Sequence, residues 1–89
     1  MNIQVHLYKD SDCDLCKMML HELIDNPPKA DVVINHIKDT DAFKPRIKSY
    51  PTIIIIDIDN NECLGIIEGF NSTNIINKII EDYETKSMV

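Results

Sequence analysis

Four consecutive isoleucines, Ile53 to Ile56, stand between Thr52 and Asp57. β-Branched residues favour strands, and a strand without a polar face has to be covered on both of its sides. The run is far shorter than the roughly 18 apolar residues of a membrane-spanning helix. It therefore predicts a central strand over residues 52–58, buried on both faces.

The first part of the chain predicts two further strands with a helix between them. Residues 2–8 alternate between apolar and polar side chains, a period of two that is typical of a strand. Residues 31–37 are rich in β-branched side chains and predict the second strand. Between them, ahead of the prolines at positions 27 and 28, five apolar residues recur at helical spacing: Leu15, Met19, Leu20, Leu23 and Ile24. A crossover of this length makes the two strands parallel.

The central strand has a predicted neighbour on each side along the sequence. Residues 59–61 form a polar turn, and residues 62–68 return as a hairpin partner. Cys63 lies in this apolar stretch and is expected to be a small buried hydrophobe, the alternative being a regulatory or metal-binding role. Residues 41–50, before the isoleucines, are expected to hold two helical turns.

A last helix is expected to begin near Asn71 or Ser72, either of which can cap it. Five side chains share one face of this helix: Ile75, Ile76, Ile79, Ile80 and Tyr83. The element order is then β-α-β-(α)-β-β-α. We expect an α/β fold in which a four-stranded mixed sheet is flanked by helices on both faces, as one domain over residues 1–89.

Composition and charge restrict the partners of this chain. Its 89 residues are too few for a second domain, and nine Lys and Arg against fifteen Asp and Glu give a formal charge of −6. Nucleic acid and anionic membranes would be repelled, so we expect neither as a partner. The odd count of three cysteines is unlike a secreted disulfide scaffold. We expect a cytoplasmic monomer.

Two of the cysteines, Cys13 and Cys16, lie three residues apart at the start of the first predicted helix. Their Cβ atoms would be about 5–6 Å apart, and a slight adjustment of the first turn allows a disulfide. The free N–H groups and the positive end of the helix dipole would stabilise a thiolate at Cys13. Cys13 is therefore the predicted nucleophile and Cys16 the resolving thiol. We expect no bound cofactor beyond this redox-active disulfide.

Three neighbours of the cysteines are predicted to tune the redox potential of the pair: Asp14, Leu15 and Lys17. A carboxylate beside Cys13 disfavours the thiolate and predicts a comparatively reducing dithiol. The alternative is that Asp14 only stabilises the first helical turn, where acidic residues are favoured.

A cysteine pair at this spacing is also half of a zinc site, which needs four ligands. Cys63, His6, His21 and His36 are the available supplements, and none stands at ligand spacing. We therefore expect no metal. His21 is expected to face solvent on the first helix.

The order of these motifs resembles the thioredoxin/glutaredoxin superfamily over nearly the whole chain. The matching motifs are Cys13-Asp-Leu-Cys16 between a strand and a helix, Tyr50-Pro51-Thr52 entering the apolar strand, and Gly69-Phe70 before the last helix. The resemblance implies a cis peptide bond before Pro51, which would face the disulfide. It also implies that Tyr50, Pro51, Gly69 and Phe70 bind an extended substrate segment, and that the protein is a protein-disulfide reductase.

Within the superfamily the chain looks more like thioredoxins and the redoxins that serve ribonucleotide reductase. Tyr-Pro-Thr, Lys17 and Gly69-Phe70 carry this likeness, and Asp10 stands where glutathione users have a basic residue. The partners so implied are a thioredoxin reductase-like flavoprotein and disulfide-containing client proteins, ribonucleotide reductase among them. The sequence departs from thioredoxins in lacking Trp-Cys-Gly-Pro-Cys and in having Leu7 where they bury an aspartate.

Three alternatives remain open from the sequence. The first is a glutaredoxin that takes electrons from glutathione, favoured by the short chain and by Tyr8, five residues before Cys13. The second is a binding module without catalysis. The third is an iron–sulfur or zinc carrier that dimerises through Cys13.

Overall fold

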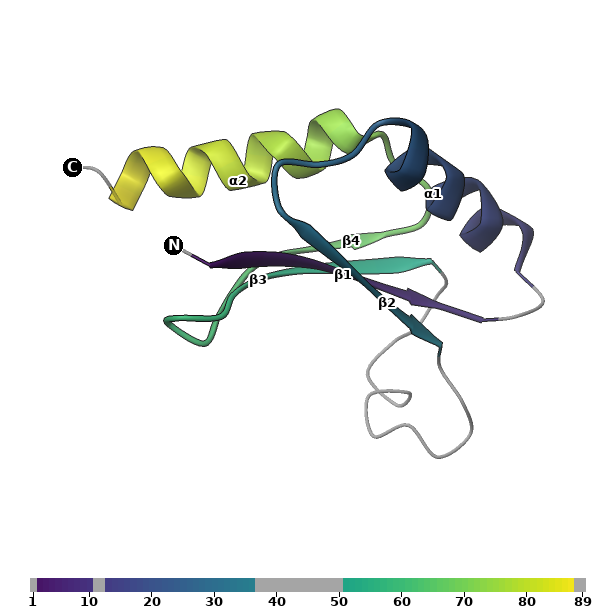
Figure 1. The fold of residues 1–89 in the computed structure, drawn as a ribbon, viewed down its shortest axis with the longest axis horizontal. Helices are drawn as coiled ribbons and strands as arrows, with labels where there is room; N and C mark the ends of the chain where they lie inside the picture. The colour runs from purple at the N-terminus through teal and green to yellow at the C-terminus, as the bar shows by residue number, and fades with distance from the viewer. Residues whose placement is uncertain (1, 11–12, 37–50, 88–89) are drawn as a thin grey trace.

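The computed structural model describes residues 2–10, 13–36 and 51–87. These residues form six elements in the order β1 (Ile3–Lys9), α1 (Asp14–Asp25), β2 (Asp31–His36), β3 (Thr52–Asp57), β4 (Glu62–Glu68) and α2 (Thr73–Ser87) (Figure 1). The strands and helices predicted within the described residues are confirmed, with starts shifted by at most two residues. The helical turns expected over residues 41–50 lie outside the described residues.

The four strands form one mixed sheet in the order β2-β1-β3-β4. β1 pairs with β2 in parallel, because α1 crosses over between them. β3 pairs with β1 and with β4 in antiparallel fashion. The isoleucine strand is therefore central, as its apolar sequence predicts, and the four-stranded mixed sheet is confirmed.

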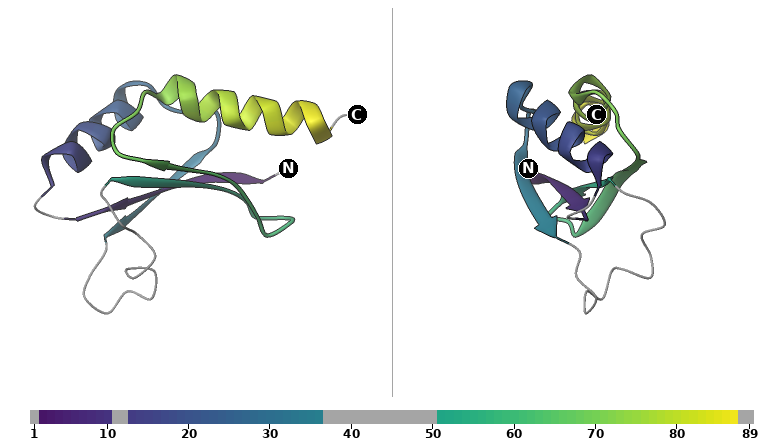
Figure 2. Two further views of the ribbon diagram at one scale, coloured as in Figure 1. Left: turned by 180° about the vertical axis from the view of Figure 1, so that it is seen from behind. Right: turned by 90° about the vertical axis from the view of Figure 1, so that its right-hand side faces the viewer.

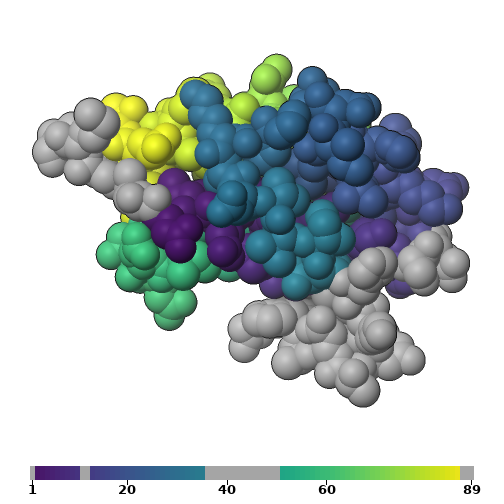
Figure 3. Space-filling model, viewed as in Figure 1, coloured from purple at the N-terminus to yellow at the C-terminus, as the bar shows by residue number. Residues whose placement is uncertain are grey.

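Both α1 and α2 cover the same face of the sheet (Figures 1 and 2). In the view of Figure 3 their side chains fill the layer above the strands. Ten buried side chains from the strands and the two helices form the hydrophobic core: Ile3, Val5, Leu7, Met19, Leu23, Ile53, Ile55, Ile67, Ile76 and Ile80. The sequence predicts helices on both faces, whereas the two described helices share one face; the helix expected over residues 41–50 lies outside the described residues.

The buried face of α1 differs from the predicted one. Leu15 and Ile24 are 47% and 63% exposed, whereas Cys16, Met19 and Leu23 are buried. Successive residues are about 100° apart around a helix, so the face centred on Met19 and Leu23 takes in Cys16 and turns Leu15 and Ile24 away. The face of α1 that packs on the sheet thus includes the second cysteine. In α2 the prediction is wrong in the same way for Ile75, which is exposed.

The predicted burial of Cys63 is also wrong, since its side chain is exposed. The register of β3 and β4 shifts between Ile55, which faces Gly65, and Ile56, which faces Cys63. Leu64 is the extra residue of this β-bulge. Because a bulge breaks the alternation of side chains, the apolar pattern of the strand does not predict which face Cys63 takes.

At the far end of β3, Asp57 has a fully buried carboxylate. It accepts hydrogen bonds from the Tyr83 hydroxyl at 2.6 Å, the Asn60 side-chain amide at 2.7 Å and the backbone N–H of Asp59 at 3.1 Å. The bonds from Tyr83 and Asn60 hold the pKa of Asp57 below its ordinary value. This network ties α2 to the turn between β3 and β4.

Candidate active site

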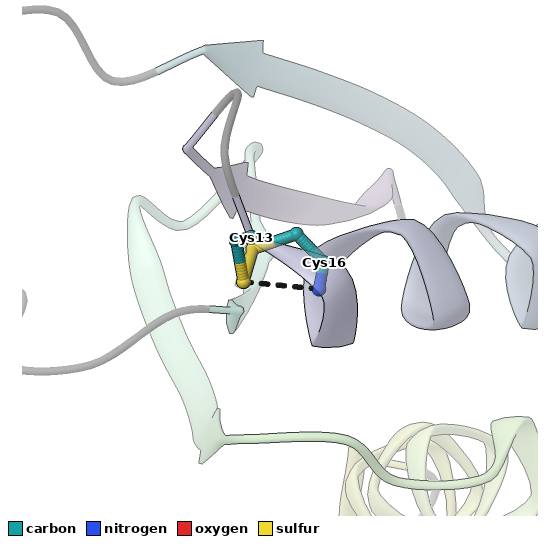
Figure 4. Close-up of a disulfide and its surroundings, with 2 residues drawn as sticks. All are labelled: Cys13 and Cys16. Atoms are coloured by element: carbon teal, nitrogen blue, oxygen red, sulfur yellow. Dashed lines mark hydrogen bonds between the residues drawn. A yellow bond between two sulfur atoms is a disulfide. The ribbon is translucent and has the colours of Figure 1, made fainter.

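Cys13 is the N-cap residue of α1, with extended backbone angles of φ −110° and ψ 113°. Its sulfur accepts a hydrogen bond from the backbone N–H of Cys16 at 3.1 Å (Figure 4). The two residues are joined as a disulfide, with their Cα atoms 5.1 Å apart, within the range such bridges adopt. The structure therefore brings the two predicted cysteines together at a helix N-terminus.

The two cysteines differ in their access to solvent. Cys13 is half-buried, whereas Cys16 is 1% exposed. Cys13 is therefore the more accessible of the two residues, and the roles of nucleophile and resolving thiol stay predictions. In the reduced protein the N–H of Cys16 and the other free N–H groups of the first turn favour a thiolate at Cys13.

The three residues predicted to tune the potential all lie exposed on the first turns of α1: Asp14, Leu15 and Lys17. Asp14 is the acidic residue of the first turn. Its charge is therefore placed where it favours the helix and disfavours a thiolate at Cys13. Its effect on the potential stays a prediction.

Of the predicted substrate-binding residues, Pro51, Gly69 and Phe70 lie at the same end of the sheet as the disulfide. The start of β3, the end of β4 and the start of α1 meet there (Figure 1). The Gly69 N–H donates a hydrogen bond to the carbonyl of buried Pro51 at 2.8 Å, and Phe70, next along the chain, is exposed. Tyr50 lies outside the described residues, and the cis peptide bond before Pro51 stays a prediction.

The far end of α1 is held by a contact that sequence reasoning missed. The Glu22 carboxylate accepts hydrogen bonds from the backbone N–H of Thr73, at 2.8 Å, and from the Asn26 side-chain amide, at 3.0 Å. The bond from the Thr73 N–H is the main cause that lowers the pKa of Glu22. The two partners are 51 positions apart in sequence, so no local pattern predicts the contact.

The side chains of two histidines, His6 and His21, are described. The His6 ring lies within hydrogen-bond distance of Gln4 and Asn35 on the sheet, and His21 is exposed on α1, as predicted. Over the described residues, no three His, Cys, Asp or Glu side chains are grouped so as to hold a metal ion. Neither described helix combines the length and apolar composition needed to cross a membrane.

No protein-family model matches the chain, and no curated protein matches its sequence. Among solved structures it is similar to thioredoxin-2 of the malaria parasite, a component of protein secretion machinery, with a TM-score of 0.74 and 21% identity over 91% of this chain and 82% of the other. Thioredoxin 1 of Thermosipho africanus gives a TM-score of 0.70 and 18% identity, over 97% of this chain and 99% of the other. The germline-specific Drosophila thioredoxin Deadhead gives a TM-score of 0.65 and 17% identity, over 90% of this chain and 80% of the other. The chain therefore has the thioredoxin-like fold that its motifs predict, with Cys13-Asp-Leu-Cys16 at the start of α1.

Proposed function

We propose that the protein is a thiol-disulfide oxidoreductase that reduces protein disulfides through Cys13 and Cys16. The observation that carries the proposal is the asymmetry of the pair at the helix N-terminus. The half-buried Cys13 sulfur accepts the Cys16 N–H, while Cys16 itself is buried. This arrangement suits a reactive thiolate followed by a protected resolving thiol.

The reaction transfers two electrons in two exchanges. The Cys13 thiolate attacks one sulfur of a client disulfide, that S–S bond breaks, and the other client sulfur leaves as a thiolate that takes up a proton. Cys16 then loses its proton and attacks the Cys13 sulfur. The mixed disulfide breaks, the second client sulfur leaves and is protonated, and the Cys13–Cys16 disulfide remains.

The proposed reductant is a flavoprotein of the thioredoxin reductase type, and ribonucleotide reductase is one proposed client. The formal charge of −6 and the exposed Asp14 beside the disulfide support this choice, because both disfavour the anionic peptide glutathione. We place the reaction in the cytoplasm, where reductants of this kind keep thiols reduced.

A coupled assay with a small disulfide protein as client tests the proposal. One arm contains thioredoxin reductase and NADPH, the other glutathione, glutathione reductase and NADPH. Cys13→Ser is the inactive control. Cys63→Ser is the matched control, because it removes an exposed thiol and leaves the pair intact.

Turnover in the thioredoxin reductase arm, lost in Cys13→Ser and kept in Cys63→Ser, is the expected result. Turnover with glutathione alone would identify a glutaredoxin instead. Absence of turnover in both arms would contradict the oxidoreductase proposal and favour a binding module or a metal carrier.

A further inference from the structure

A groove of about 430 Å³ lies between the edge strand β4 and helix α2. Leu64 of β4 and Ile79 of α2 contribute apolar side chains to its lining. The helix approaches the strand closely here because Gly65 has no side chain: a Cβ atom at this position would lie 3.3 Å from Ile79. Glu62, at the start of the groove, pairs with Asp57 at the end of β3 farthest from the disulfide. The groove is therefore a surface separate from the candidate active site.

The charged groups of this groove are mainly acidic. Glu62 and Asp82 line it together with one cation, Lys86, and neither acid forms an ion pair with a described residue. The hydroxyl of Tyr83 lies 3.2 Å from Glu62 and 2.6 Å from the buried Asp57, so its single proton goes to the nearer carboxylate. Glu62 thus receives no proton from Tyr83, and three carboxylates lie in or beside the groove. Their field attracts a cationic ligand.

The backbone of β4 offers the other half of a binding surface, because this strand is the last of the sheet. The Gly69 N–H donates to the Pro51 carbonyl, so the backbone groups of Gly69 point towards β3. Inward and outward positions alternate along an antiparallel pair, and Glu68 and Ile66 therefore point outward. The Asn71 side-chain amide donates to the Glu68 carbonyl at 3.4 Å and closes the edge at that end. The N–H and C=O of Ile66 point out of the sheet, where another extended segment can pair with them.

The side chains of an added strand would alternate between the two faces of the sheet. Ile67 belongs to the core beneath the helices, so its neighbour Ile66 points to the other face, where it is 61% exposed and offers an apolar contact. On the helix-covered face the added strand would meet the acidic groove. The bulge at Leu64 limits regular pairing to the short stretch around Ile66. A segment that fits both faces therefore alternates apolar and basic side chains.

We propose that β4 and the groove beside α2 form a docking site for an extended segment of a partner protein, in which basic and apolar side chains alternate. The segment adds to β4 as a further strand through the backbone of Ile66 and places its basic side chains near Glu62 and Asp82. A second copy of this chain fits the site less well, because each copy has a formal charge of −6 and β4 itself contains no Lys or Arg. The inference is independent of the proposed disulfide chemistry.

The test measures binding of a short fluorescent peptide of alternating lysine and valine, blocked at both ends, to the oxidised protein. Fluorescence anisotropy should rise saturably with protein concentration. The same peptide with glutamate in place of lysine should not bind, because the groove repels it. A version N-methylated at every residue keeps the side chains and charges but cannot pair with a strand, so its affinity should be at least several-fold lower.

Variants of the protein locate the site. Asp82→Asn and Glu62→Gln each remove one charge from the groove and should weaken binding of the lysine–valine peptide about twofold to fivefold. Ile66→Thr keeps a β-branched side chain in the strand and should weaken binding by a similar factor. Asp14→Asn is the matched control, because it removes one exposed charge at the disulfide end, and it should leave the affinity nearly unchanged.

A second measurement uses the wild-type protein, so that it does not depend on how the variants fold. Cys63 is exposed and lines the groove, and saturating peptide should slow its reaction with a maleimide several-fold. The inference is wrong if the peptide does not bind, if the N-methylated version binds equally well, if Asp14→Asn weakens binding as much as Asp82→Asn, or if Cys63 reacts at an unchanged rate. A dimer that the peptide dissociates, seen by sedimentation, would also overturn it and assign the edge to a second copy.

Discussion

The hydroxyl of Tyr83 donates a 2.6 Å hydrogen bond to the buried carboxylate of Asp57, which joins α2 to the end of β3. Tyr83→Phe removes this donor and leaves the rest of the ring. We expect the melting temperature to fall by roughly 5–10 °C, because a buried carboxylate loses one of its partners. Reduction of a client disulfide should be unchanged below the transition, since the contact lies at the end of β3 opposite the disulfide. An unchanged melting temperature would contradict this role.

The same contact predicts how stability depends on acid. The pKa of Asp57 is held below its ordinary value by Tyr83 and Asn60. A carboxyl group with a lowered folded-state pKa contributes stability above its unfolded pKa, and this contribution is lost as the pH falls through the folded value. In Tyr83→Phe the pKa of Asp57 is lowered less, so acid unfolding should begin at a higher pH than in the wild type. Melting curves between about pH 2 and pH 6 measure this, and superimposable acid limbs would count against it.

His6 is expected to remain neutral at pH values where an exposed histidine is charged. Its Nε2 atom lies 2.9 Å from the Gln4 side-chain oxygen and its Nδ1 atom 3.4 Å from the Asn35 amide nitrogen, so the neutral ring with its proton on Nε2 satisfies both. Burial lowers the pKa of His6. Stability should therefore decline as the pH falls below about 6.5, the ordinary histidine value, towards the folded-state pKa. An NMR titration of the ring with a midpoint at or above 6.5 would refute this.

The proposed roles of the two active-site cysteines predict a trapped intermediate. Cys16→Ser keeps the Cys13 nucleophile and removes the thiol that would release the client. A mixed disulfide with a client protein should accumulate and be visible on a non-reducing gel. The Cys16→Ser and Cys13→Ser variants should both also carry Cys63→Ser, because the exposed thiol of Cys63 could form an adduct of its own. Cys13→Ser should give no adduct. An equal adduct in that variant would contradict the assignment of Cys13 as the nucleophile.

Asp14→Asn separates the two explanations of the acidic residue in the first turn of α1. If the charge disfavours the Cys13 thiolate, the reduction potential should become less negative by roughly 10–20 mV in the variant. Asp25→Asn, at the other end of the helix, is the control. A lower melting temperature with an unchanged potential would mean that Asp14 only stabilises the helix.

Much of the fold within the described residues follows from local patterns. The alternation before Lys9, the isoleucine run and the helical spacing of the last segment each predict an element that the structure contains. The pairing of strands follows from the length of the connections. The candidate site could also be predicted from the sequence, because Cys13 and Cys16 are close in sequence and a helix N-terminus is known to stabilise a thiolate.

The remaining features depend on contacts that no local pattern records. Cys16 is buried and Leu15 exposed because the sheet, and not the helical stripe alone, selects the face of α1. Glu22 meets Thr73 only after both helices pack on the same side of the sheet. The exposure of Cys63 depends on a bulge, which a count of apolar residues does not reveal.

Because the bulge at Leu64 leaves Cys63 exposed, the oxidised protein has one free thiol that a reagent can reach. Cys63 pairs with Ile56, and four strand residues, about 14 Å, separate that position from Thr52 at the disulfide end of β3. A maleimide dye should therefore attach to Cys63 while Cys13 and Cys16 are bridged, at a distance that leaves the reactive end uncovered. The chain thus carries its own attachment point for a reporter, and the number of dyes bound before and after reduction gives the oxidation state of the pair.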